Sequence, residues 1–180
     1  MIQRIRVNLE EIESMLYFWQ ATNDREKVAE SYLHEIASMR GLTTSYDDEF
    51  NAESVRKVLS AITNREILSQ KTKKEARFWN NNMWMMEDLS HTDTMVKPLK
   101  KLNIDDMVEV IKDAEGSSKY EELEVRFSPL HMDEYLIKGN MLIINFFRVL
   151  PSFEDEESAT IGGKQIKDFI KEKLEELLKK

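Results

Sequence analysis

The stretch YLIKGNMLIINFF, residues 135–147, decides the fold class of this chain. Residues 135–137 are apolar, a glycine-containing turn follows at 138–140, and a longer run that is apolar except for Asn145 fills 141–147. Two short apolar runs on either side of such a turn are typical of a β-hairpin. The second run is apolar on both faces, so we expect it to form a central strand that helices cover on at least one side.

The segments around this hairpin predict further β-structure and a closing helix. Leu123, Val125 and Phe127 alternate with charged residues up to Pro129, which predicts a half-buried strand. We therefore place the hairpin part at about 120–150. Apolar residues recur at helical spacing after residue 164, which predicts an amphipathic helix over about 164–179.

The part before the strands, about 8–116, has helical spacing and helix-capping residues. Asn8 and Asn51 are good N-caps. The pattern predicts helices over 24–39 and 103–116, and one or two helices between 65 and 89 with Asn80, Asn81 and Asn82 as the expected break. The predicted fold is α+β: a single domain, 1–180, in which the largely helical N-terminal two thirds pack on a small antiparallel sheet of three or four strands, closed by the C-terminal helix.

Composition narrows the functional classes. The 180 residues include no cysteine, which excludes disulfides, thiolate nucleophiles and cysteine-based zinc sites and favours a cytoplasmic location. The net charge of −8 and the lack of a long apolar run predict a protein that binds neither nucleic acid nor membrane. No motif identifies a family or a catalytic residue, so whether the chain is an enzyme stays open.

The least ordinary feature is an apolar cluster that one helix face cannot bury. Its members are Phe78, Trp79, Met83, Trp84, Met85 and Met86. A face that buries Trp79, Met83 and Met86 leaves Trp84 and Met85 on another side of the helix. Methionine and tryptophan are also the residues of adaptable binding surfaces. We therefore predict an interaction or regulatory protein that uses this cluster either to bind a protein partner or to self-associate with a second copy.

The alternative is a small-molecule-binding protein or enzyme with a pocket between the helices and the sheet. In that case His131, Glu134 and Tyr135 would add polar contacts to Trp79 and Trp84. Exposure of Trp84 would favour the interaction hypothesis, whereas an enclosed cavity with convergent polar groups would favour the ligand hypothesis.

Two further features have ordinary structural explanations. His34 and His91 each follow a glutamate by four residues, but two ligands do not make a metal site, so we predict no metal and no cofactor. Gly162, Gly163 and Lys164 precede the last helix and could present backbone amides to an anion. They lack the glycine spacing of nucleotide-binding motifs, and a turn explains them equally well.

Overall fold

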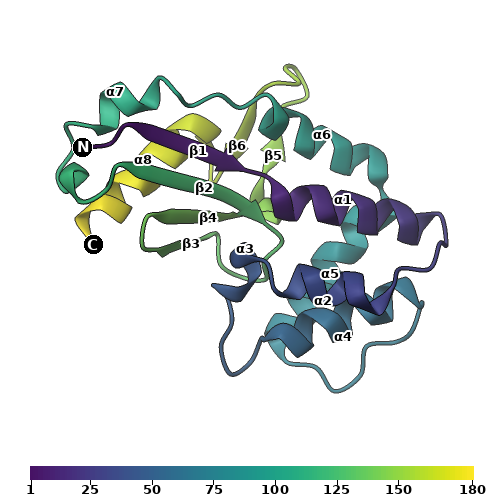
Figure 1. Cartoon of the computed structure of the whole chain (residues 1–180). Coiled ribbons are helices and arrows are strands. Elements are labelled where there is room, and N and C mark those ends of the chain that lie inside the picture. Colours follow the sequence, from purple (N-terminus) through teal and green to yellow (C-terminus); the bar gives the residue numbers. More distant parts are fainter.

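The computed structural model describes all 180 residues and places a helical part beside a β-sheet (Figure 1). The helices are α1 (Glu10–Asn23), α2 (Glu30–Ala37), α3 (Arg40–Thr43), α4 (Ala52–Thr63), α5 (Lys73–Glu87), α6 (Leu89–Lys100), α7 (Met107–Ile111) and α8 (Ile166–Lys179). Two single 3-10 turns lie at Ser117–Lys119 and Phe146–Arg148. The combination of these helices with two sheets confirms the α+β class.

The larger sheet has four strands in the order β1-β2-β4-β3, formed by β1 (Arg4–Asn8), β2 (Glu122–Ser128), β3 (Tyr135–Lys138) and β4 (Met141–Asn145). The predicted hairpin is β3 and β4, which pair antiparallel, with Tyr135 opposite Ile144. As expected, β4 is an interior strand and all five of its residues are buried. A second, antiparallel sheet contains β5 (Leu150–Pro151), β6 (Ala159–Ile161) and β7 (Lys164–Gln165).

The larger sheet is mixed, whereas the sequence predicted an antiparallel one. The difference arises from β1, which the sequence analysis did not recognise as a strand. β1 pairs parallel with β2, placing Ile5 opposite Leu123, and β2 pairs parallel with β4. Parallel strands need a long crossover connection, and here helices α1 to α7 supply it between β1 and β2.

Helices cover both faces of the sheet. Leu123, Val125 and Phe127 belong to the main core together with residues of α8, and this helix lies behind the strands in Figure 1. The other face of β2 packs against α1 and α3, so β2 is buried on both sides and the prediction of a half-buried strand was wrong. The main core is one continuous cluster of 43 buried residues that draws on helices and strands alike.

Several helix boundaries differ from the prediction. Residues 24–29 precede α2 as a turn and loop, and the expected helix over 103–116 is reduced to Met107–Ile111. Gly116 has φ +86° and a Cβ there would lie 1.9 Å from the Leu178 carbonyl oxygen, so the chain must turn away at that point. The expected break at Asn80–Asn82 does not occur, because α5 continues through it. No helix in the chain combines the length and apolar character needed to cross a bilayer.

Candidate interaction surface on helix α5

Helix α5 begins with a complete capping box. The Thr72 hydroxyl accepts a hydrogen bond from the Glu75 amide at 3.1 Å, and Glu75 Oε1 accepts one from the Thr72 amide at 2.9 Å. Lys57 Nζ of α4 lies 3.0 Å from the same Oε1 atom. Burial raises the pKa of Glu75, but bonds from Ser54, Thr72 and Lys57 outweigh it and hold the pKa below its ordinary value. The start of α5 is thereby fixed to α4.

One side of α5 faces the core and explains why the asparagines do not break the helix. Phe78 and Asn82 are fully buried, and Met85 is nearly so. Trp19 Nε1 donates to Asn82 Oδ1 at 3.0 Å, while Asn82 Nδ2 donates to the Phe78 carbonyl at 2.9 Å. Asn82 is therefore a satisfied polar group inside the core, and it ties α5 to α1.

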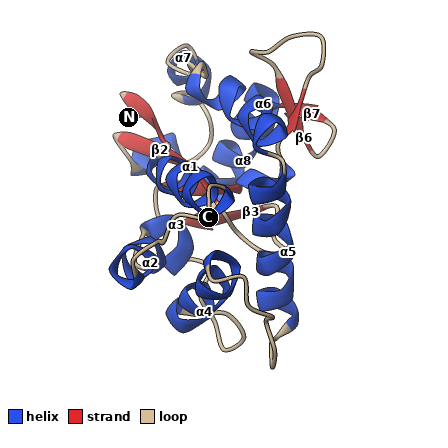
Figure 2. Cartoon of the chain, turned by 90° about the vertical axis from the view of Figure 1, so that its right-hand side faces the viewer, coloured by secondary structure: helices blue, strands red, loops and turns tan.

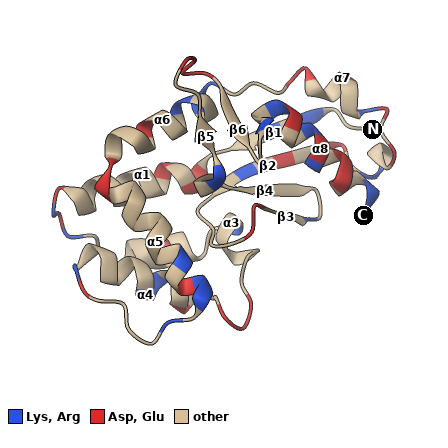
Figure 3. Cartoon of the chain, turned by 180° about the vertical axis from the view of Figure 1, so that it is seen from behind, with Lys and Arg blue, Asp and Glu red and all other residues tan.

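The remaining apolar residues lie on two other sides of α5. Residues 79, 83 and 86 share one face by the helical repeat, and residues 78, 82 and 85 share the neighbouring buried face. Residue 84 falls outside both faces. Charged residues are absent between Arg77 and Glu87, and α5 is correspondingly free of charge over most of its length in Figure 3.

Trp84 lies on the surface beside a shallow apolar groove. It is 72% exposed, and Leu150 on β5 is 61% exposed. The groove has a volume of about 240 Å³, and its apolar lining comprises Trp84, Met85, Met95, Phe147, Val149 and Leu150. Asn81 and His91 add its polar lining. We call these eight residues the Trp84 patch. The patch joins α5 and α6 to a segment more than fifty residues later in the chain.

The face with Trp79, Met83 and Met86 borders a second hollow. This hollow lies between α5, the end of α4 and the connection 64–71, and its volume is about 380 Å³. Figure 2 shows α4 and α5 side by side in this part of the molecule. We call it the α4–α5 pocket. It lies between helices, and not between helices and sheet as the ligand hypothesis expected.

The predicted polar pocket residues do not meet in one place. His131 is 2% exposed, and its ring lies edge-on to Phe50 at 4.7 Å. Burial lowers the pKa of His131. Tyr135 instead contacts α8, where its hydroxyl donates to Glu176 Oε2 at 2.6 Å, and this hydrogen bond raises the pKa of Tyr135. A Cβ at Gly162 would lie 3.0 Å from Glu134 Oε2, so Glu134 faces the second sheet.

Gly162 and Gly163 form the tight turn between β6 and β7, with φ of +57° and +80°. Positive φ at both central positions is the geometry of a two-residue hairpin turn, which glycine adopts without strain. Lys164 follows in β7, and its ammonium group pairs with Glu172 of α8. The carboxylate of Glu134 beside this turn works against an anion there.

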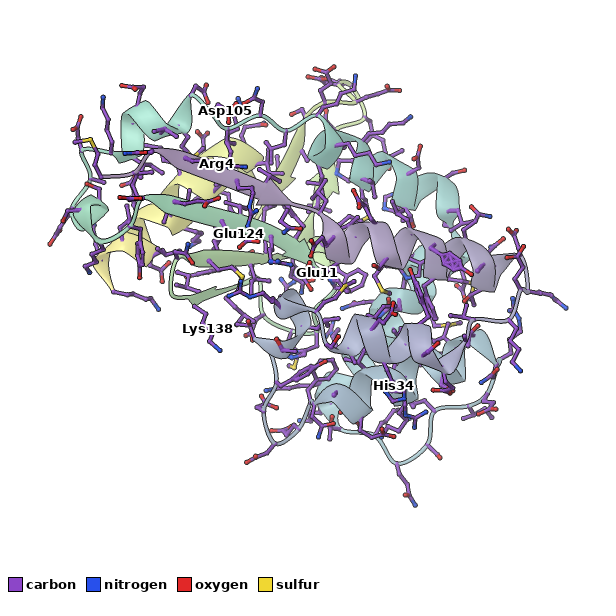
Figure 4. The ribbon with its side chains drawn as sticks, viewed as in Figure 1. Arg4, Glu11, His34, Asp105, Glu124 and Lys138 are labelled. Carbon is purple, nitrogen blue, oxygen red and sulfur yellow. The ribbon has the colours of Figure 1, made fainter.

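His34 and His91 are both exposed. His34 lies on α2, where Figure 4 labels it, and His91 lines the Trp84 patch. Nowhere in the chain do three or more histidine, aspartate or glutamate side chains gather closely enough to hold a metal ion.

The structure also contains a buried charge network that the sequence analysis missed. Arg126 Nη1 donates to both oxygens of Glu11, at 2.7 and 2.8 Å, and Arg126 Nε lies 2.8 Å from Glu124 Oε1. All three residues are at most 5% exposed, and Figure 4 labels two of them, Glu11 in the first turn of α1 and Glu124 on β2. Burial raises the pKa of Glu11 against the opposing effect of Arg126. The sequence feature that could have indicated this network is the alternation of charged residues along β2. The sequence analysis interpreted these charged residues as the solvent-exposed face of a half-buried strand.

A scan against protein-family models found no match, and neither a search of curated proteins nor a search of solved structures found a similar protein.

Proposed function

We propose that this chain is a self-associating interaction protein and that the Trp84 patch docks a second copy of the chain. The supporting observation is the exposure of Trp84, 72%, directly beside the apolar groove and Leu150. Tryptophan is among the residues that most often dominate the binding energy of protein interfaces. In the free chain the indole ring of Trp84 remains in water, so the favourable free energy of burying it is not gained. A partner that covers the ring would supply that free energy.

The shape of the patch suits a contact between identical copies. In a dimer with two-fold symmetry the same patch must be complementary to itself. The Trp84 patch supplies a protruding side chain and a groove next to each other, so Trp84 of each copy enters the groove of the other. Asn81 and His91 then contribute polar groups to the contact.

The charge of the patch also permits this contact. Each copy has a net charge of −8, so two copies repel each other on average. None of the eight patch residues is acidic, however, and burying the patch brings no carboxylate into direct contact with another. Glu87 and Asp88 lie at the neighbouring turn between α5 and α6, which makes the remaining repulsion sensitive to salt.

The setting that fits this proposal is a reducing compartment such as the cytoplasm, because the chain contains no cysteine and its contacts do not depend on disulfides.

The test is the oligomeric state of the purified full chain over a wide range of concentration. We expect a concentration-dependent dimer that becomes stronger when salt screens the repulsion, and that Trp84→Ala abolishes. A wild-type chain that stays monomeric at millimolar concentration in high salt overturns the proposal.

A further inference from the structure

The α4–α5 pocket is a second apolar site that is separate from the Trp84 patch. Its walls are formed by Ala61 and Ile62 of α4, Leu68 of the connection, and Trp79, Met83 and Met86 of α5. Its volume of about 380 Å³ falls within the range of small-molecule sites. Methionine side chains repack easily, so Met83 and Met86 can adapt the pocket to the outline of a ligand.

Two cations lie at the rim of this pocket without an acidic partner. Arg65 Nη2 donates to the Thr22 carbonyl at 2.9 Å, and Lys71 Nζ donates to the Leu68 carbonyl at 2.9 Å. Neither forms an ion pair, whereas Lys57 and Lys74 each have a carboxylate partner. Main-chain carbonyls leave the charges unneutralised, and both cations keep donors free for an anion.

The backbone holds Arg65 at this rim. Arg65 follows the last turn of α4 with φ +56°, the left-handed conformation in which a helix commonly ends. Glu66 is the one acidic residue at the rim, so the three rim charges sum to +1 in a chain whose total is −8. In the apolar wall, Trp79 Nε1 is buried without a hydrogen-bond acceptor. An apolar hollow with a cationic rim matches a ligand that has an apolar body and an anionic end.

We infer that the α4–α5 pocket binds a small amphipathic anion, such as a medium-chain or aromatic carboxylate. The apolar body lies between Ile62 and Met83, and the anionic group contacts Arg65 and Lys71. This inference does not depend on self-association, because the pocket and the Trp84 patch share no residue.

The experiment titrates the full chain with the fluorescent sulfonate 1-anilinonaphthalene-8-sulfonate and then displaces it with decanoate, decan-1-ol or decylamine. The three competitors share one apolar chain and differ in charge. We expect decanoate to displace the probe at the lowest concentration and decylamine at the highest. Vesicles of anionic phospholipid, tested separately, distinguish a free carboxylate from a lipid headgroup as the source of the anion.

Matched variants locate the binding. We expect Arg65→Gln combined with Lys71→Gln to weaken decanoate binding by roughly tenfold or more, because hydrogen bonds to charged groups are among the stronger ones. The control combines Arg25→Gln with Lys73→Gln. Arg25 also has positive φ after a helix, at +61°, and both control residues are exposed and form no ion pair. Decanoate should bind this control as it binds the wild type.

A methyl NMR spectrum of the methionines identifies the site directly. Decanoate should shift the signals of Met83 and Met86 and leave Met95, in the Trp84 patch, in place. Absence of saturable binding, equal displacement by the three competitors, equal loss in the control variant, or loss in Trp84→Ala would each overturn the inference. Binding to vesicles without binding to free decanoate would overturn the free-carboxylate assignment.

Discussion

Replacing Trp84 by alanine tests the proposed contact with a magnitude that follows from its exposure. A large aromatic side chain buries about 150–250 Å² when fully covered. Trp84 is 72% exposed, which leaves roughly 110–180 Å² available to a partner. A two-fold dimer contains this side chain twice. If each copy buries only half of the available area, the dimer loses about 2.7–4.5 kcal/mol at ~25 cal/mol per Å².

At about 1.4 kcal/mol per tenfold change, this loss corresponds to a dissociation constant weaker by roughly 100- to 1,500-fold. The monomer should stay folded, because the smaller buried portion of Trp84 accounts for only about 1–2 kcal/mol of folding stability. Trp84→Ala is therefore expected to give a folded monomer whose free energy of unfolding is lower by about that amount.

The assay is sedimentation velocity from micromolar to millimolar protein, with denaturant unfolding of each variant in parallel. Phe153→Ala is the matched control, because Phe153 is 95% exposed and lies in the acidic loop between β5 and β6, outside the Trp84 patch. Figure 3 shows that loop as a cluster of acidic residues. A Trp84→Ala chain that dimerises like the wild type, or a Phe153→Ala chain that loses the dimer, would refute the assignment of the contact to this patch.

Four other substitutions test the fold around these sites by denaturant unfolding. Glu75→Gln should lower the free energy of unfolding by about 1 kcal/mol at neutral pH. Because the pKa of Glu75 is lowered in the folded chain, this difference between variant and wild type should be present above pH 4.5 and disappear as the pH falls through the folded pKa. Gly116→Ala should lower the free energy of unfolding by about 3 kcal/mol or more, because the added Cβ meets the Leu178 carbonyl. Gly139 also has positive φ but faces open space, so Gly139→Ala should lower it by only about 1–2 kcal/mol. Arg126→Met should lower the free energy of unfolding by about 3–5 kcal/mol, because it leaves the buried carboxylate of Glu11 without its cation and removes the nearer of the two cations beside Glu124, the other being Arg6 at 3.6 Å. A smaller loss would contradict the buried network.

The elements that the sequence predicted well are those with a local signal. The hairpin of β3 and β4 has its two apolar runs and its turn within 13 residues, and α8 carries its apolar stripe within a single helix. β1 has only the short alternation of Ile5 and Val7, and its partner β2 lies more than a hundred residues later. A strand whose pairing is that remote leaves little in its own sequence to identify it.

The candidate site was only partly predictable for the same reason. Helical spacing alone indicated that the cluster from Phe78 to Met86 could not share one face. It did not indicate which residue would be exposed, because that depends on Leu150 and Phe147, which join Trp84 from a distant segment. The asparagines were misinterpreted because Asn82 is stabilised by Trp19, a contact across 63 residues.

Helix α5 contributes to two apolar surfaces, the Trp84 patch and the α4–α5 pocket, because its core-facing side is held in place by hydrogen bonds. Asn82 bonds both to Trp19 of α1 and to the Phe78 carbonyl of its own helix, and the capping box with Lys57 fixes the first turn to α4. A helix held at both places cannot rotate to hide Trp84 without leaving Asn82 unsatisfied in the core, which is costly. The exposure of Trp84 is therefore a consequence of how the core is built, and a partner that covers Trp84 has no competing burial within the chain to overcome.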